Sequence, residues 1–228
     1  GFNRTFFKCM NSEISFIRHS LAHLLAKAVL ELDPQAKLGT GPATDPGFFY
    51  DFEFSEGNIL TDRDFKKIEK HMRGYIRQDL GFERKEISLE EAEQLFQNQP
   101  YKLELARDFA AEEQTLTIYQ TGDFIDLCRG GHVERTSAID PNAFALIRIA
   151  GAYWKSDESK PQLTRITGIA FETKDELEKY QAMLEEAKKR DHKKLGKELG
   201  LFVFSDLVGG GLPLFTPKGT IIRTLLDE

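Results

Sequence analysis

Cysteine is scarce in this sequence, with only Cys9 and Cys128 among 228 residues. So low a count argues against a disulfide framework and fits a reducing compartment, so we expect a cytoplasmic protein. No run of about 18 apolar residues is present, which argues against a transmembrane helix and a membrane partner. The N-terminus lacks an apolar signal core and begins with Gly1 instead of Met, which leaves a natural and an experimental truncation equally open.

An excess of basic charge is also missing. The formal net charge is -6 and the isoelectric point is near 5.5. This excludes a generic nucleic-acid binder that uses its whole surface, but it permits an RNA enzyme with a local basic patch. Hydrophobic residues make up 40% of the chain, enough for a sizeable core in one large domain, or in one domain plus part of another.

Several well-known catalytic motifs are absent. There is no HExxH helix of a zinc protease and no GxSxG elbow of a serine hydrolase. The glycine run at 209–211 lacks the GxxxxGK[ST] spacing of a phosphate-binding loop. The candidate chemistry therefore has to come from other residues.

The spacing of apolar residues predicts helices alternating with short strands. Helices are predicted at 14–32, at 61–80 and, after a capping box at Ser88, up to about 97. Strands are predicted within 36–54 and at 82–87, 116–120, 124–127, 144–150 and 162–170. This order indicates an α+β domain with a mostly antiparallel sheet and packed helices.

The last third of the sequence is different in character. A single long, charged helix is predicted over 173–199, and its end, 188–197, is basic. Such a run is usually only a solvated helix face, and it could also meet RNA phosphates. A loop rich in glycine and proline follows at 207–220, and a further helix is predicted to begin at Thr220 and run to 228. We therefore predict a domain boundary near 172, a linker helix and the beginning of a second domain.

Two short motifs contain the residues best suited to chemistry. His19 and His23 are four apart and would share one helix face, and Cys128 and His132 flank two glycines. Each pair alone is more often structural, but together, with Asp126 nearby, they favour one shared site. A zinc tetrad and a thiol nucleophile paired with a histidine are both chemically possible.

Five segments occur in a fixed order: RHSLAHLL (Arg18–Leu25), GPATDPGFFYDF (Gly41–Phe52), DLCRGGHV (Asp126–Val133), GAYW (Gly151–Trp154) and KRDHKKLGKELGLF (Lys189–Phe202). Together they resemble the bacterial-type threonyl-tRNA synthetases of class II, and the match covers the chain from about residue 14 onward. Related alanyl-tRNA editing proteins share the histidine and cysteine pairs, but the GFFYD and GAYW segments favour the threonyl family.

The resemblance implies a division of the chain. Residues 1–12 would be an N-terminal tail, 13–172 an editing domain of the second-additional-domain type, 173–200 a linker helix and 201–228 a truncated start of the catalytic domain. The rest of that domain, with its ATP, Mg and Zn sites, would be absent, so we expect this chain not to charge tRNA. The family's full enzyme ligates threonine to tRNA(Thr) with ATP and is expected to be a homodimer, whereas the fragment can be a monomer.

The resemblance also implies an activity, hydrolysis of serine from the acceptor end of mischarged tRNA(Thr). Serine lacks one methyl of threonine, and a pocket gains only about 1–3 kcal/mol from that methyl, so a second, hydrolytic site is needed. The implied substrate-binding residues are Tyr50 and Asp126. The implied catalytic residues are His19, His23, Lys102, Cys128 and His132.

The family's editing site is expected to need no metal or other cofactor, and we predict none here. Two further hypotheses remain. One is a zinc-dependent hydrolase of the alanyl-editing kind, with zinc at His19, His23, Cys128 and His132. The other is a non-catalytic module that binds tRNA through the basic segment 188–197.

Overall fold

A computed structural model describes residues 13–58, 60–205, 207–209 and 211–227. The predicted tail, 1–12, therefore lies outside the described residues. The chain divides into two compact units with the boundary after Leu177. None of the helices in the described ranges has the length and apolar character needed to cross a membrane.

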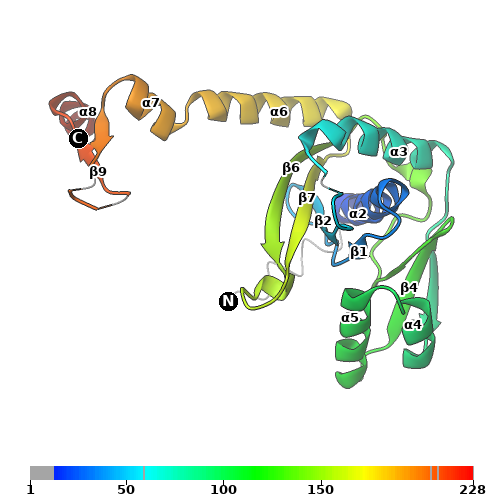
Figure 1. The fold of residues 1–228 in the computed structure, drawn as a ribbon. Helices are drawn as coiled ribbons and strands as arrows, with labels where there is room; N and C mark the ends of the chain where they lie inside the picture. Colours follow the sequence, from blue (N-terminus) through cyan, green and yellow to red (C-terminus); the bar gives the residue numbers. More distant parts are fainter. Residues whose placement is uncertain (1–12, 59, 206, 210, 228) are drawn as a thin grey trace. The chain divides into compact units, whose positions relative to one another are not determined.

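The core of the first unit is a four-stranded antiparallel sheet with a buried helix against it. In spatial order the strands are β1 (Lys37–Leu38), β2 (Gly47–Glu53), β7 (Gln162–Ala170) and β6 (Phe144–Tyr153). Helix α2 (Glu13–Leu32) lies between this sheet and α3 (Phe65–Arg77), which follows a 3-10 turn, η1 (Asp62–Asp64) (Figure 1).

Burial on all sides explains why α2 contains so few charged residues. Leu21, Leu24 and Leu25 are completely buried, as expected for a helix enclosed by other elements. On β2, the alternation of a strand directs Phe48 and Phe52 into the same core. The buried polar side chains on these two elements therefore need an explanation, and two of them, His23 of α2 and Tyr50 of β2, belong to the candidate site.

A smaller antiparallel sheet forms a second layer. Its strands are β3 (Glu83–Ile87), β4 (Leu116–Thr121) and β5 (Phe124–Leu127) in that order, covered by α4 (Leu89–Leu95) and α5 (Pro100–Ala111). Two further 3-10 turns are η2 (Thr136–Ala138) and η3 (Trp154–Ser156). The predicted α+β class with antiparallel sheets and packed helices is confirmed.

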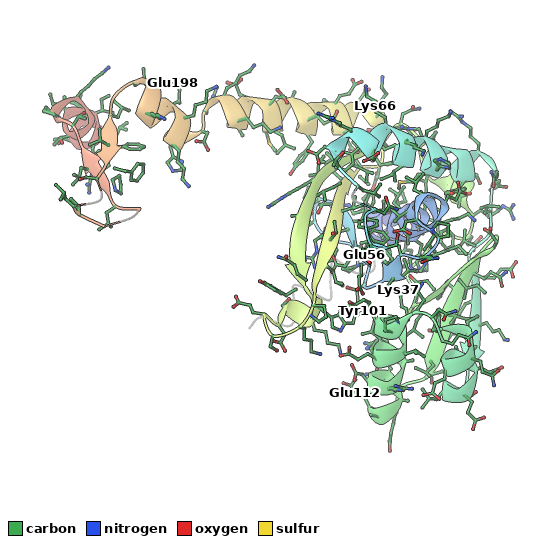
Figure 2. The ribbon with its side chains drawn as sticks, viewed as in Figure 1. Lys37, Glu56, Lys66, Tyr101, Glu112 and Glu198 are labelled. Atoms are coloured by element: carbon green, nitrogen blue, oxygen red, sulfur yellow. The ribbon has the colours of Figure 1, made fainter. Side chains whose placement is uncertain are left out.

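Helix α5 was not predicted, because its segment seemed only polar. Pro100 starts it at the first helical position, where a missing N–H costs nothing. The Tyr101 hydroxyl donates to Glu53 at 2.7 Å, and Figure 2 shows Tyr101 at the start of α5, near Lys37 of β1. The polar face thus makes specific contacts with the larger sheet, which sequence periodicity cannot reveal.

The second unit corrects two predictions. The long helix is interrupted: α6 (Lys174–Lys189) ends, and α7 (His192–Glu198) begins because the Asp191 carboxylate accepts from the backbone N–H groups of Lys193 and Lys194. The predicted loop contributes one strand of a hairpin. This hairpin pairs β8 (Phe202–Phe204) with β9 (Pro213–Phe215), and α8 (Pro217–Asp227) follows it.

Candidate active site

All seven site residues predicted from the sequence lie in one region of the first unit. They come from four elements that are distant in sequence. Helix α2 contributes His19 and His23, β2 contributes Tyr50, α5 contributes Lys102, and β5 with the turn after it contributes Asp126, Cys128 and His132.

The histidine–cysteine cluster (His19, His23, Cys128 and His132) forms one half of the site. The Cys128 Sγ lies 3.1 Å from His132 Nε2 and 3.4 Å from His19 Nε2. The rings of His19 and His132 stack with centroids 4.2 Å apart. One nitrogen or sulfur from each of the four residues lies within 4.8 Å of the others, so the set can hold a metal such as zinc.

A glycine turn brings the two members from β5 together. Cys128 donates its N–H to the Thr117 carbonyl at 3.0 Å, which ties the end of β5 to β4. Gly130 and Gly131 then adopt φ values of 112° and 88°, which disfavour any side chain. The chain reverses there, and His132 faces back toward Cys128.

The Asp126 network (Asp126, Lys102 and Tyr50) forms the other half. The Lys102 ammonium lies 2.5 Å from Asp126 Oδ1, and the Tyr50 hydroxyl donates to Oδ2 at 2.6 Å. All three side chains are almost completely buried. Desolvation opposes an ion pair this deep, and the Tyr50 hydrogen bond to Oδ2 stabilises the carboxylate.

His23 connects the two halves. Its Nε2 lies 3.6 Å from Asp126 Oδ2, and its ring meets that of His19 edge-on at 5.2 Å. Its Nδ1 is buried and has no hydrogen-bond partner among the described residues. A buried polar nitrogen of this kind is unusual in a purely structural core and is typical of a site that receives water or a ligand.

Burial keeps the three histidines neutral. It lowers the pKa of His19, and it lowers the pKa values of His23 and His132 much further, helped by the neighbouring imidazoles. The imidazoles are therefore uncharged at pH 7, with one nitrogen in each that can accept a proton or bind a metal.

The Cys128 thiol is also neutral. Burial raises its pKa to about 12, well above that of an ordinary thiol. A nucleophilic cysteine needs a lowered pKa, so this environment disfavours the hypothesis of a thiol nucleophile. Burial and the Asp126 carboxylate similarly raise the pKa of Tyr50, which keeps its hydroxyl a hydrogen-bond donor.

Three neighbours of the site were not singled out from the sequence. Ser20 contacts His132, the ring of Tyr119 lies 4.6 Å from that of His132, and Phe82 stacks on the same imidazole at 4.9 Å. Ser20 lies inside the HxxxH motif, which was the only signal available. Tyr119 and Phe82 look like ordinary strand aromatics.

The class of domain follows from comparison with known families. Residues 116–167 match the family described as the threonyl and alanyl tRNA synthetase second additional domain. The matched segment contains Asp126, Cys128 and His132, whereas the site residues on α2, β2 and α5 lie before it.

Individual relatives point to one branch of that class. The chain is 51% identical over 217 residues to a threonine–tRNA ligase of Dehalococcoides mccartyi, covering 95% of this chain and 36% of the relative. The corresponding enzyme of Gloeobacter violaceus is 51% identical over 214 residues, covering 93% and 34%. The chain thus spans about a third of the length of these curated relatives. The resemblance to the bacterial-type threonyl-tRNA synthetases is confirmed, and the chain matches one segment of them.

Proposed function

We propose that this chain is the editing segment of a threonine–tRNA ligase and hydrolyses the ester that joins serine to tRNA(Thr). The observation that carries this proposal is the buried Asp126 carboxylate, held by Lys102 and Tyr50 beside three neutral imidazoles. The Asp126 carboxylate supplies a partner for the α-ammonium group of the seryl ester. The neutral imidazoles supply proton acceptors for the water that hydrolyses it.

The Asp126 network selects the substrate. The α-ammonium of the seryl group, or its hydroxyl, meets the Asp126 carboxylate. Because Tyr50 is completely buried and hydrogen-bonded, the side-chain pocket cannot widen easily to accept the extra methyl of threonine. The correct product is thereby excluded by bulk, whereas serine enters.

Water is the proposed nucleophile and His19 the proposed base. Among the three imidazoles, His19 has the pKa nearest its ordinary value, since burial lowers the other two much further. The water oxygen attacks the seryl carbonyl carbon while His19 takes one of its protons. The bond to the ribose 3′-oxygen then breaks, and that oxygen receives the proton, which releases serine and intact tRNA.

Lys102 has two proposed roles in this reaction, to position the water and to stabilise the developing negative charge. Its ammonium is held 2.5 Å from the carboxylate and lies 5.2 Å from the Tyr50 ring centroid, so it cannot swing away into solvent. A fixed cation beside the substrate positions the water and stabilises the negative charge that develops on the carbonyl oxygen.

We further propose that hydrolysis proceeds without a metal ion, as the family resemblance implies. The second candidate function is a zinc-dependent hydrolase, which the close approach of four ligand atoms favours. Zinc bound there would polarise the carbonyl or the water. Elemental analysis of the purified chain separates the two: stoichiometric zinc whose removal abolishes hydrolysis would overturn the metal-free proposal.

The decisive measurement is deacylation of seryl-tRNA(Thr) and threonyl-tRNA(Thr) by the 228-residue chain. We expect serine release to be at least about 10-fold faster than threonine release, as a single methyl permits. His19→Ala should slow serine release by about 100-fold or more, because it removes the general base.

Matched controls are available in the same chain. His192→Ala removes an exposed histidine of α7, and Lys155→Ala a lysine outside the site; both should hydrolyse seryl-tRNA normally. Binding of tRNA without any release of serine would instead support the non-catalytic module. Equal release of both amino acids would defeat the selection attributed to Tyr50 and Asp126.

A further inference from the structure

Ser20 occupies an unusual position for a serine inside a helix. It is completely buried in α2, next to His19 in sequence. A serine in a helix interior usually points to solvent or bonds back to its own helix. Here the hydroxyl reaches across to the turn after β5: it accepts the Val133 N–H at 3.1 Å and lies 3.3 Å from His132 Nδ1.

The hydrogen-bond partners of the Ser20 hydroxyl limit where its own proton and the ring proton of His132 can lie. A serine hydroxyl has one proton to donate and can accept two hydrogen bonds. The Val133 N–H occupies one acceptor position, so the hydroxyl proton is free for His132 Nδ1. If Nδ1 accepts, the proton of the neutral ring must be on Nε2, which lies 3.1 Å from the Cys128 sulfur.

The remaining contacts of the histidine–cysteine cluster are compatible with a proton on His132 Nε2. An added Cβ at Gly131 would lie 3.7 Å from His19 Nδ1, and backbone hydrogen bonds with Gly131 and Gly130 act to raise the pKa of His19. If Nδ1 is the donor in these contacts, the acceptor nitrogen of His19 is Nε2. That nitrogen lies 3.4 Å from Cys128 Sγ, so it can accept the thiol proton. The sulfur can in turn accept from His132 Nε2–H, as it does from the Gly130 N–H at 3.4 Å.

We propose that Ser20 is a positioning residue for the hydrolysis, whose hydroxyl fixes His132 as the Nε2–H tautomer and thereby orders a chain of hydrogen bonds. The chain runs from Ser20 through His132 and Cys128 to His19. Its last member is the proposed base, so the order at Ser20 makes Nε2, which faces the Cys128 thiol, the nitrogen of His19 that carries no proton. This inference rests on the proposed function only where it concerns the reaction rate.

The tautomer can be measured without any substrate. In nitrogen-15 NMR spectra of the 228-residue chain, the ring nitrogens of His132 should show a protonated Nε2 and an unprotonated Nδ1. Ser20→Ala should convert His132 to a mixture of tautomers, whereas Ser20→Thr keeps the hydroxyl and should keep the single form. A protonated Nδ1 in the unmutated chain would overturn the proposal, even if Ser20→Ala does not fold.

Kinetics test the consequence for the reaction. Ser20→Ala should lower kcat for seryl-tRNA hydrolysis by about 10-fold or more, as removal of a partner that orients a functional histidine typically does, with little change in KM. Ser20→Thr should recover most of that loss. The matched control is Thr136→Val, which removes another completely buried hydroxyl, one that bonds only to backbone groups of Tyr75, Ile76 and Leu80. It should leave kcat unchanged.

The outcomes separate the two proposals. Equal losses for Ser20→Ala and Ser20→Thr, with His132 unchanged in its spectra, would mean that packing matters and the hydroxyl does not. Absence of hydrolysis by the unmutated chain would refute the proposed function, while the spectra would still decide the role of Ser20.

Discussion

Lys102 shows how far a single residue can depart from the expectation for its type. Lysine is rarely buried unless it is paired. Here it is almost completely enclosed and forms its ion pair with Asp126, another buried charge. Nothing in the segment around Lys102 distinguishes it from a surface lysine, so only the family resemblance predicted its place.

The first prediction concerns this pair. Lys102→Met should lower the free energy of unfolding by about 3–5 kcal/mol, because it leaves the Asp126 charge buried without its cation. Adding Asp126→Asn should restore part of the loss, since the uncompensated charge is then gone. Urea denaturation of the two single variants and the double variant measures this coupling.

A surface ion pair provides the comparison. Lys155 contacts Glu104 and Asp108, but all three side chains are about a third or more exposed. Lys155→Met should therefore cost no more than about 1 kcal/mol. Strictly additive losses in the Asp126 and Lys102 variants would contradict the account of the buried pair.

At the scale of elements, the turn after β5 decides whether the cluster forms. Gly130 has a φ of 112°, and a Cβ placed there would lie 2.8 Å from the Tyr119 hydroxyl oxygen and 3.5 Å from the next ring atom. The turn therefore excludes side chains for two independent reasons, backbone strain and a clash with β4.

The second prediction separates those reasons. Gly130→Ala should destabilise the chain by more than Gly57→Ala, because Gly57 also has a positive φ but has no atom within 4 Å of an added Cβ. Tyr119→Phe removes the clashing oxygen, so the Gly130→Ala variant should lose less stability in the Tyr119→Phe background than in the parent. Thermal and urea unfolding of the four variants measure both effects.

The same turn connects stability with activity. Tyr119 also contacts the His132 ring, so its displacement by Gly130→Ala should slow seryl-tRNA hydrolysis, and Tyr119→Phe should partly reverse this. If Gly130→Ala and Gly57→Ala have equal effects on both stability and rate, the clash is unimportant.

Elements with a repeating pattern were the ones that sequence could predict. Strands β4, β5 and β7 and helix α2 agree closely with the predicted ranges, because alternation or three-and-four spacing reports which side chains are buried. Helix α5 was missed because its buried face includes Lys102, which hides the apolar pattern. The break before α7 was missed because Asp191 caps a new helix from within a charged run.

At the scale of the whole molecule, the neutral histidines couple folding to pH. Burial lowers the folded-state pKa values of His19, His23 and His132 below the value of about 6.5 expected in the unfolded chain. The unfolded state therefore binds more protons once the pH falls below about 6.5. Stability is complete above that pH and is lost as the pH drops toward the folded-state values.

The third prediction follows from this sign. Between about pH 6.5 and 5, the free energy of unfolding should fall with a slope of up to about 1.4 kcal/mol per pH unit for each of the three histidines. The reference pKa values of Asp and Glu side chains, about 4, lie below this window, so the histidines should dominate. Replacing His132 with Asn should reduce the slope by up to about 1.4 kcal/mol per pH unit, the contribution of one histidine. An unchanged slope would show that folding does not keep this imidazole neutral.

By itself, the sequence determined the fold class, most elements of the first unit and the identity of the candidate residues. Periodicity, turn residues and ordered motifs are local properties, so they can be recognised in the amino-acid sequence. The tertiary structure decided how α2, β2, α5 and the turn after β5 meet at that site. It also decided the directions of the contacts there, from the Lys102–Asp126 ion pair to the hydrogen bonds of Ser20. Those interactions join residues up to 113 positions apart, and their energies come from burial that no local pattern contains.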